Sequence, residues 1–227
     1  MHKASDARFW NRIARKYAKD AIADQGGYER TLDFTRALLR PEDRVLELGC
    51  GTGSTALRLA GGVNRYLATD LSAAMIQIAR EKQALETLPS LSFQIATAES
   101  PMLPLGGYDA VLGFNYLHMV RDVPVTLWRI HNLLVAGGLF VSKTPCLGDM
   151  TPLLSRVLLP GMRAIGKAPY VSVLKEADLC ALVTAAGFEI LAVEDHATRG
   201  KGHRPCIVAR KSAAAQASPS PAIYLDA

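Results

Sequence analysis

The sequence predicts an α/β fold in which helices surround a mostly parallel β-sheet. Residues 44–61 read as a short buried strand, a glycine-rich turn and a helix, and further strand-like and helical segments alternate along the chain. The chain has 227 residues, and 49% of them are hydrophobic. This amount of apolar material is enough to bury a sizeable core in one domain.

Two helices are expected ahead of the first strand. Residues 9–18 and 28–39 have helical patterns, and Gly26-Gly27 separates them. Pro41 ends the second helix, because proline has no backbone N–H to continue the hydrogen-bond ladder.

The glycine-rich turn has the properties of a cradle for a small ligand. Gly49, Gly51 and Gly53 can adopt positive φ and let the backbone approach a ligand closely. The helix that opens at Ser54 directs unpaired N–H groups into the same space. The turn also matches the dinucleotide pattern G-x-G-x-x-G/A, with Asp70 at about the interval of a ribose-binding acid.

Strand-like segments continue after this turn. Residues 65–70 end in Asp70, and Ser72 is well placed to cap the helix that follows. The other expected elements are strands within residues 91–99 and 108–119, a helix end, Gly-Gly turn and strand over 131–141, a helix over 174–186 capped by Gly187, and strands over 188–194 and 204–210.

Such a turn can hold more than one kind of nucleotide-like ligand, and Glu47 indicates which kind it binds here. A carboxylate at this place would repel a pyrophosphate. Glu47, Gly49, Gly51 and Gly53 form E-x-G-x-G-x-G, which resembles motif I of the class I S-adenosylmethionine-dependent methyltransferases. S-adenosylmethionine (SAM) carries an ammonium and a sulfonium, so an acid beside it is chemically sensible.

The resemblance implies a Rossmann-like fold. Its seven-stranded, mostly parallel sheet would have the order 3-2-1-4-5-7-6, with helices on both faces and an N-terminal helical cap over the cofactor cleft. The expected divisions are a cap at residues 1–40, a core at 41–211 with a lid insertion at about 147–170, and a disordered tail at 212–227, whose Ala/Ser/Pro-rich sequence is of low complexity.

The resemblance also implies a cofactor site for SAM, with S-adenosylhomocysteine (SAH) as product and no metal. Glu47 would lie near the amino end of the methionine, Asp70 would accept hydrogen bonds from both ribose hydroxyls, and Glu99 would lie near the adenine amino group. Asp70 could instead be a helix cap, and Glu99 a solvated loop residue. The full set of expected cofactor contacts is Tyr17, Glu47, Gly49, Cys50, Gly51, Gly53, Asp70, Leu71, Met75, Ala98, Glu99 and Asn115.

Direct in-line displacement at the methyl group needs alignment more than it needs catalytic groups. A general base helps if the acceptor is a hydroxyl, and His118 is the candidate because it follows the fourth strand and titrates near neutrality. It could instead only pack or bond to backbone. His196 and His203 are expected to be surface loop residues. Trp10 and Tyr17 share a helix face, which either covers the cofactor or packs on the sheet.

The predicted function is transfer of a methyl group to a small, aromatic or hydrophobic acceptor, as in the ubiquinone/menaquinone-biosynthesis-type branch. One alternative is a methyltransferase that acts on protein or RNA. A further alternative is an NAD(P)-dependent oxidoreductase or a non-catalytic nucleotide-binding domain. The net charge of +5 permits acidic partners. The sequence has no basic block interleaved with aromatics, so a nucleic-acid-binding surface is not predicted.

The remaining composition predicts a cytoplasmic protein. No apolar run is long enough for stable membrane insertion, and the first residues lack the apolar stretch of a secretory signal. The four cysteines are widely spaced, which argues for reduced thiols rather than a zinc site or disulfides. Nothing in the sequence predicts an oligomeric state.

Overall fold

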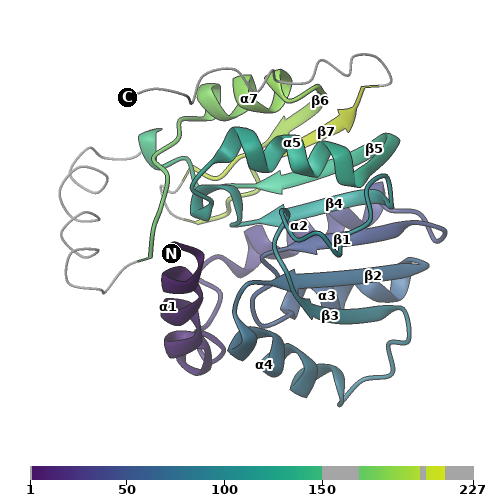
Figure 1. Cartoon of the computed structure of the whole chain (residues 1–227), viewed down its shortest axis with the longest axis vertical. Helices are drawn as coiled ribbons and strands as arrows, with labels where there is room; N and C mark the ends of the chain where they lie inside the picture. Colours follow the sequence, from purple (N-terminus) through teal and green to yellow (C-terminus); the bar gives the residue numbers. More distant parts are fainter. Residues whose placement is uncertain (1, 150–168, 200–202, 213–227) are drawn as a thin grey trace.

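Seven β-strands form one sheet (Figure 1): β1 (Arg44–Leu48), β2 (Arg65–Asp70), β3 (Leu91–Ile95), β4 (Tyr108–Phe114), β5 (Leu134–Lys143), β6 (Phe188–Glu194) and β7 (Cys206–Lys211). Their order is β3-β2-β1-β4-β5-β7-β6. Strands β1 to β5 pair in parallel, whereas β7 is antiparallel to both β5 and β6. The computed structural model describes residues 2–149, 169–199 and 203–212. The predicted sheet order is confirmed.

Helices cover both faces of the sheet, as predicted. They are α1 (His2–Tyr17), α2 (Gln25–Leu38), α3 (Ser54–Leu59), α4 (Ala73–Gln83), α5 (Val123–Leu133) and α7 (Glu176–Ala185), with short 3-10 turns η1 (Ala60–Gly62), η2 (Leu117–Met119) and η3 (Leu147–Asp149). One hydrophobic core joins the sheet to α2, α3 and α4 through Leu32, Ala56 and Ile76. A second core joins the other face to α5 and α7 through Leu127 and Leu179.

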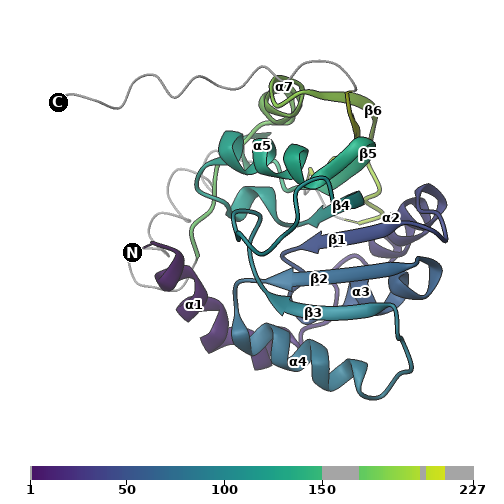
Figure 2. The ribbon, with the colours of Figure 1, turned by 45° about the vertical axis from the view of Figure 1, so that its right-hand side comes forward.

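Helix α1 lies beyond the carboxyl ends of the parallel strands, next to α4 (Figures 1 and 2). Ala14 packs against Met75 and Ile78 of α4 in a small separate core. The rings of Trp10 and Tyr17 meet edge to face with centroids 6.0 Å apart, so these two residues share a helix face as predicted. The helix is therefore held where it borders the glycine-rich turn.

The predicted separation of two N-terminal helices at Gly26-Gly27 is wrong, because both glycines lie in the first turn of α2. The helix begins instead after Asp24, whose side chain accepts a hydrogen bond of 3.0 Å from the Gly27 N–H. A Cβ on Gly27 would stand 2.8 Å from the carbonyl oxygen of His196. The glycine is needed for close packing, and the cap residue sets the helix start.

The predicted Gly-Gly turn before the fifth strand is also wrong. Strand β5 begins at Leu134, opposite Tyr108, and the next pair in the register joins Ala110 to Leu139. The extra residues form a bulge, in which Gly137 has a φ of +74°. The glycine pair thus bends a continuous strand and does not precede it.

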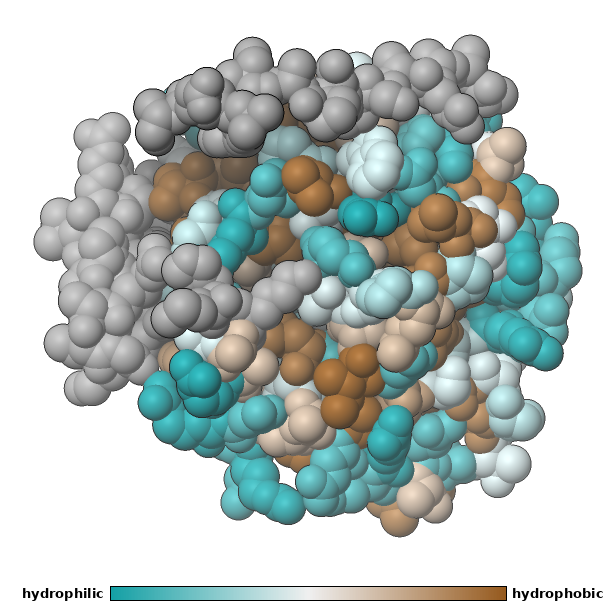
Figure 3. All heavy atoms as spheres, viewed as in Figure 1, coloured by the Kyte–Doolittle hydropathy of each residue, from teal (hydrophilic) through white to brown (hydrophobic). Residues whose placement is uncertain are grey.

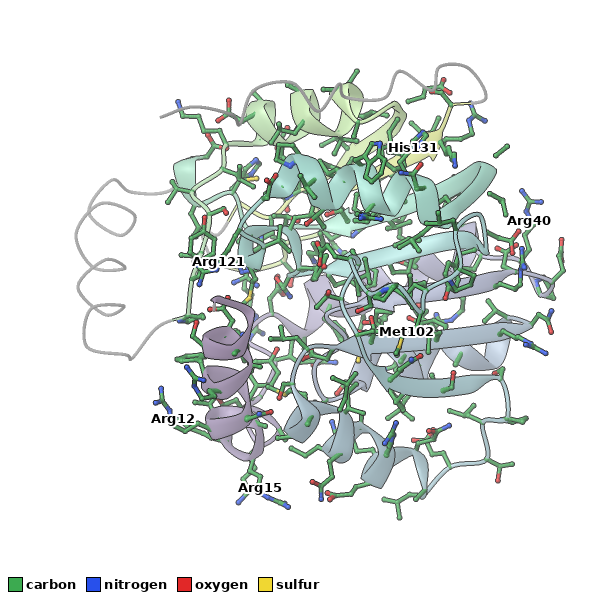
Figure 4. All side chains as sticks on the ribbon, viewed as in Figure 1. Arg12, Arg15, Arg40, Met102, Arg121 and His131 are labelled. Carbon is green, nitrogen blue, oxygen red and sulfur yellow. The ribbon has the colours of Figure 1, made fainter. Side chains whose placement is uncertain are left out.

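The connection from β3 to β4 crosses the sheet without a helix, over residues 96–107. Met102 and Leu105 are 61% and 67% exposed there, apolar side chains are visible in the middle of this face in Figure 3, and Figure 4 labels Met102 in front of the sheet. A groove of about 710 Å³ lies at the opposite edge from the glycine-rich turn, lined by the amino ends of strands, including Arg44, Arg65 and Tyr108.

Candidate functional site

The predicted site residues gather at the carboxyl edge of the sheet. Strand β1 lies between β2 and β4, so the chain leaves β1 toward one side and β4 toward the other. In open α/β sheets this point, outside the carboxyl ends of the strands, is where ligands bind. Glu47 is the penultimate residue of β1, Asp70 ends β2, and Asn115 follows β4 with a φ of +52°.

The glycine-rich turn has the predicted left-handed backbone. Gly49, Gly51 and Gly53 have φ values of +69°, +55° and +77°. A Cβ on Gly49 would stand 2.8 Å from the Tyr116 ring, and one on Gly53 would stand 2.7 Å from the ring of Phe93. On Gly51 the nearest side-chain atom would be Tyr17 Cε1, 3.8 Å away, so the backbone at the centre of the turn faces open space.

Asp70 ties the end of β2 to this turn. Its Oδ2 accepts a 3.0 Å hydrogen bond from the Gly51 N–H, and its Oδ1 accepts a 2.8 Å hydrogen bond from the Ser72 N–H. Burial raises the pKa of the carboxyl, against the effect of these backbone bonds. The cap of α4 is Ser72, whose hydroxyl accepts from the Met75 N–H. Asp70 is therefore not the helix cap, and each of its oxygens retains acceptor capacity.

Glu47 is a buried carboxyl whose pKa is raised toward 7 by the fold. The Tyr66 hydroxyl donates a 2.9 Å hydrogen bond to Glu47 Oε2. Burial raises the pKa of Glu47 to about 7, opposed by the bond from Tyr66 and reinforced by the charge of Asp70. A cation bound beside this carboxyl would stabilise its ionised form and lower its pKa. Tyr66 reaches Glu47 from the neighbouring strand, a contact that no local sequence pattern identifies.

Ala98 and Glu99 lie in the loop that follows β3, at the carboxyl edge of the sheet. Glu99 Oε1 accepts a 3.0 Å hydrogen bond from the Thr126 hydroxyl of α5, so Glu99 is not a freely solvated loop residue. The Tyr116 hydroxyl forms a hydrogen bond with the backbone of Ala98, and burial raises the tyrosine's pKa. Tyr116 therefore links the loop after β4, the loop after β3 and the glycine-rich turn.

Helix α1 borders the site through its last turn. Tyr17 is 47% exposed, and burial of its hydroxyl together with the charge of Asp70 raises its pKa. Asn11 Oδ1 accepts hydrogen bonds from the Ser72 hydroxyl at 2.7 Å and the Ala74 N–H at 3.1 Å. Met75 packs beneath α1, and Leu71 is half-buried beside it. The helix is thus bonded to the same loop that carries Asp70.

Arg121 fixes the other end of α1. Its guanidinium pairs with Asp6 at 3.0 Å and lies 4.4 Å from the ring centroid of Tyr170. Figure 4 shows Arg121 between the start of α1 and the chain that continues toward α7. The predicted lid at about 147–170 is described only at its two ends, and residues 150–168 lie outside the described residues, as do residues 213–227 of the predicted tail.

His118 lies in η2, just after β4. Its Nδ1 is buried and has no hydrogen-bond partner among residues 2–149, 169–199 and 203–212. Burial and the charge of Arg204 lower the pKa of His118 to about 4, so the imidazole is neutral at pH 7. Its carbonyl oxygen accepts a 2.7 Å hydrogen bond from the Ser172 N–H. The backbone of His118 is thus fixed to the chain before α7, and its ring has one buried nitrogen without a partner among the described residues.

The two histidines expected in surface loops have different outcomes. Only His196 departs from the expected surface position: it is 5% exposed, with Nδ1 3.1 Å from the Thr31 hydroxyl and Nε2 3.1 Å from Glu194. The prediction is wrong because the loop after β6 folds back onto α2. His203 is partly exposed and pairs with Glu176.

Lys82 is a contact of the turn that sequence reasoning missed. Its Nζ donates to the Thr52 hydroxyl at 2.9 Å and to the Ser54 hydroxyl at 3.1 Å, and burial lowers its pKa. No local pattern identifies this residue, because it comes from α4 and lies far from the turn in sequence. The helix that opens at Ser54, as predicted, has only six residues and so adds little dipole.

The described part of the chain contains no group of His, Cys, Asp or Glu side chains that could hold a metal ion. The four cysteines are free, and burial raises the pKa of Cys50 well above its usual value. Among the described helices, none has the length and apolar character needed to cross a bilayer.

The chain resembles known methyltransferases in sequence. An uncharacterized methyltransferase of Mycobacterium bovis is 36% identical over 94 residues, which are 41% of this chain and 46% of that protein. The EEF1A lysine methyltransferase 4 of Mus musculus is 33% identical over 148 residues, or 56% of this chain and 57% of its own length. The chain thus aligns with about half the length of these curated relatives.

The fold is shared as well. The crystal structure of a Synechocystis magnesium protoporphyrin IX methyltransferase with bound SAH superposes with a TM-score of 0.70 and 20% identity, covering 93% of this chain and 100% of that one. A family model described as a methyltransferase domain matches residues 13–193, more than half of the chain. With this match, the protein belongs to the methyltransferase-domain family.

Proposed function

We propose that this protein transfers a methyl group from SAM to a small acceptor with an aromatic or hydrophobic body. The observation that carries the proposal is the arrangement of two buried carboxyls, Glu47 and Asp70, around a turn of positive-φ glycines, with Asp70 bonded to the Gly51 N–H at 3.0 Å. This arrangement suits a cationic nucleoside, and the family match supports it.

Each part of SAM has a chemical counterpart at this edge. The ammonium would meet Glu47, whose raised pKa makes it responsive to an added cation. The ribose hydroxyls would donate to Asp70, and the adenine amino group to Glu99 or to the loop that begins at Ala98. The open backbone at Gly51 leaves room for the ligand, and Tyr17 would cover it from α1.

The chain's own residues mainly position the reactants. SAM, when bound, would supply a methyl group on a sulfonium, and the bonding electron pair would stay on sulfur as the acceptor's lone pair formed the new bond. Correct alignment alone is worth about 7–11 kcal/mol. For a hydroxyl acceptor, the neutral His118 would take the released proton at Nδ1, the atom that has no partner among the described residues. Exclusion of water would fall to α1, whose Tyr17 borders the glycine-rich turn.

Aromatic groups near the site favour an acceptor with a flat, apolar body. Phe9, Trp10 and Tyr17 form a continuous edge-to-face series on α1. Tyr170 lies under Arg121 on the chain that leads to α7, and Val173 is half exposed beside it. The magnesium protoporphyrin IX methyltransferase described above takes its name from a macrocyclic aromatic compound. Membership of the ubiquinone/menaquinone-type branch is part of this proposal.

A protein acceptor is the second candidate. It is favoured by the similarity to the mouse EEF1A lysine methyltransferase 4, at 33% identity over 148 residues. A lysine acceptor would have to lose its proton before attack, and His118, with a pKa of about 4, is a weak base for that step. The discriminating measurement is whether labelled methyl groups from SAM are transferred to small molecules or to protein in extracts.

The cofactor assignment is tested by calorimetric titration with SAM, SAH, NAD and NADP. Micromolar binding of SAM and SAH without binding of the nicotinamide nucleotides is the expected result. Binding of NAD or NADP alone would overturn the proposed function and favour an oxidoreductase or a nucleotide-binding domain.

A further inference from the structure

Charged residues lie at several strand ends along the carboxyl edge of the sheet. Glu47 and Asp70 are among the last residues of β1 and β2, and Glu99 follows β3. On the other side Lys143 ends β5 and Arg204 precedes β7, with the acid Glu194 at the end of β6 opposite Cys206. The acids of β1, β2 and the loop after β3 suit the cationic cofactor of the proposed function. Arg204 is left for the second reactant.

Arg204 is positioned by the pairing of β7 with β5. Cys206 lies opposite Lys143, and the Cys146 N–H donates a 2.9 Å hydrogen bond to the carbonyl oxygen of His203. Strand β5 in turn pairs with β4, whose last residue, Phe114, is opposite Lys143. Residue 204 therefore stands at the end of β5, one strand away from the loop that carries His118.

The charge of Arg204 reaches two groups of the site that come from different elements. It lowers the pKa of His118, in η2, and opposes the rise in the pKa of Tyr17, in the last turn of α1. It also lowers the pKa of Lys143. Together with the pairing of β7 with β5, these effects place residue 204 near the end of β5, η2 and the last turn of α1, beside the proposed cofactor site.

Arg204 differs from its basic neighbours in having no protein partner among the described residues. The Lys143 Nζ donates to the Thr31 hydroxyl at 2.7 Å and to the Gly27 carbonyl at 3.2 Å, and His203 pairs with Glu176. Arg204 is exposed and takes part in no hydrogen bond or ion pair within the described ranges. The buried Nδ1 of His118 is likewise without a partner there.

We propose that the acceptor carries a carboxylate or phosphate group and that Arg204 binds it, which makes Arg204 a specificity-determining residue. A guanidinium presents two parallel N–H donors that match the oxygens of either group. The proposal rests on the proposed methyl transfer and adds the charge of the acceptor to it. With the anionic group on Arg204, the nucleophilic atom of the acceptor would lie between His118 and the methyl group.

The experiment compares phenolic acceptors that differ in the group para to the hydroxyl, which is anionic in two of them and neutral in the third. Para-hydroxybenzoate, para-hydroxyphenyl phosphate and para-hydroxybenzamide, with longer-chain analogues of each, are assayed with methyl-labelled SAM and the full chain. We expect the carboxylate or the phosphate series to have a KM about 10-fold to 100-fold below that of the amide series, the range for one charge-assisted contact. The carboxylate and phosphate arms identify which oxyanion is preferred.

Variants assign the preference to Arg204. Arg204→Gln should remove it, and Arg204→Lys should retain part of it, since lysine keeps the charge but not the two parallel donors. The matched control is Arg210→Gln, which removes one positive charge from the far end of β7, where Arg210 pairs with Glu189 at 2.8 Å. Affinity for SAM, measured by calorimetry, should change by less than about twofold in all three variants.

The outcomes separate this proposal from the proposed function. Equal use of charged and neutral acceptors, a preference that survives in Arg204→Gln, or transfer to neither anionic series by a protein that binds SAM would each overturn the role of Arg204. Failure of the wild-type protein to bind SAM would overturn the proposed function itself.

Discussion

The Asp70 carboxylate accepts a 3.0 Å hydrogen bond from the backbone N–H of Gly51, which joins the end of β2 to the centre of the glycine-rich turn. This bond connects the acid proposed to hold the ribose with the backbone proposed to lie against the cofactor. The turn and Asp70 are therefore structurally coupled, so a substitution in one should change the position of the other.

Replacing Asp70 with Ala should weaken SAM binding by at least about 2 kcal/mol, since each charge-assisted hydrogen bond to ribose contributes roughly 1.5–3 kcal/mol and water replaces part of it. Calorimetric titration measures the change. Asp33→Ala is the control, because Asp33 forms an exposed ion pair with Arg36 on α2. Unchanged SAM affinity in a folded Asp70→Ala protein would remove Asp70 from the ribose site.

Glu47 should make the protein less stable as the pH rises. Its pKa is about 7 in the folded state and near the ordinary value of 4.5 when unfolded, so the folded state binds more protons between these two values. The free energy of unfolding should therefore fall by about 3 kcal/mol from pH 4.5 to pH 7 on account of this group and stay level above pH 7.

Denaturant unfolding at several pH values checks this expectation. Glu47→Gln keeps the acceptor for the Tyr66 hydroxyl but cannot ionise, so the variant should gain stability relative to the wild type as the pH rises through this window. A difference between the two proteins that is the same at pH 5 and pH 8 would mean that the Glu47 pKa is not raised.

A methyl group at Gly53 should destabilise the fold more than one at Gly51. Both glycines have positive φ, which costs other residues about 1–2 kcal/mol. At Gly53 the new Cβ would also stand 2.7 Å from the ring of Phe93 and 2.9 Å from the Cβ of Ala79, and such crowding adds about 1–3 kcal/mol.

The comparison of Gly53→Ala with Gly51→Ala in chemical denaturation isolates this crowding. Gly62→Ala is the reference, because a Cβ there would have no neighbour within 4 Å. Equal losses at Gly51 and Gly53 would show that the backbone conformation alone accounts for the cost.

Replacing His118 with Gln should lower kcat about 10²–10⁴-fold for a hydroxyl acceptor if Nδ1 takes the proton, while SAM affinity stays the same. Because burial holds the pKa of His118 at about 4, titration of His118 should cause no change in wild-type kcat between pH 5.5 and pH 8. The matched control is His131→Gln, since His131 lies in α5 and its ring packs against Phe188 of β6. Retention of more than a third of kcat in His118→Gln would leave His118 a packing residue.

The sequence by itself determined most of the strands and the glycine-rich turn, but not the start of β5. The boundaries of β6 at Phe188 and Glu194 follow from a mostly apolar run between Gly187 and polar residues, and the positive φ of Gly49, Gly51 and Gly53 is tolerated because glycine has no Cβ. These features depend on local patterns that one segment contains. The sheet order came from the family resemblance of the E-x-G-x-G-x-G motif, and the structure confirms it.

Only the tertiary structure decided which side chains support the site. Tyr66, Lys82 and Tyr116 contact Glu47, the turn and Ala98 from other elements, and the placement of Arg204 depends on the pairing of β7 with β5. The pKa values of Glu47 and His118 likewise depend on burial, which no local pattern specifies. These properties arise from contacts between segments distant in sequence, so they are fixed by how the elements pack and not by the composition of any one of them.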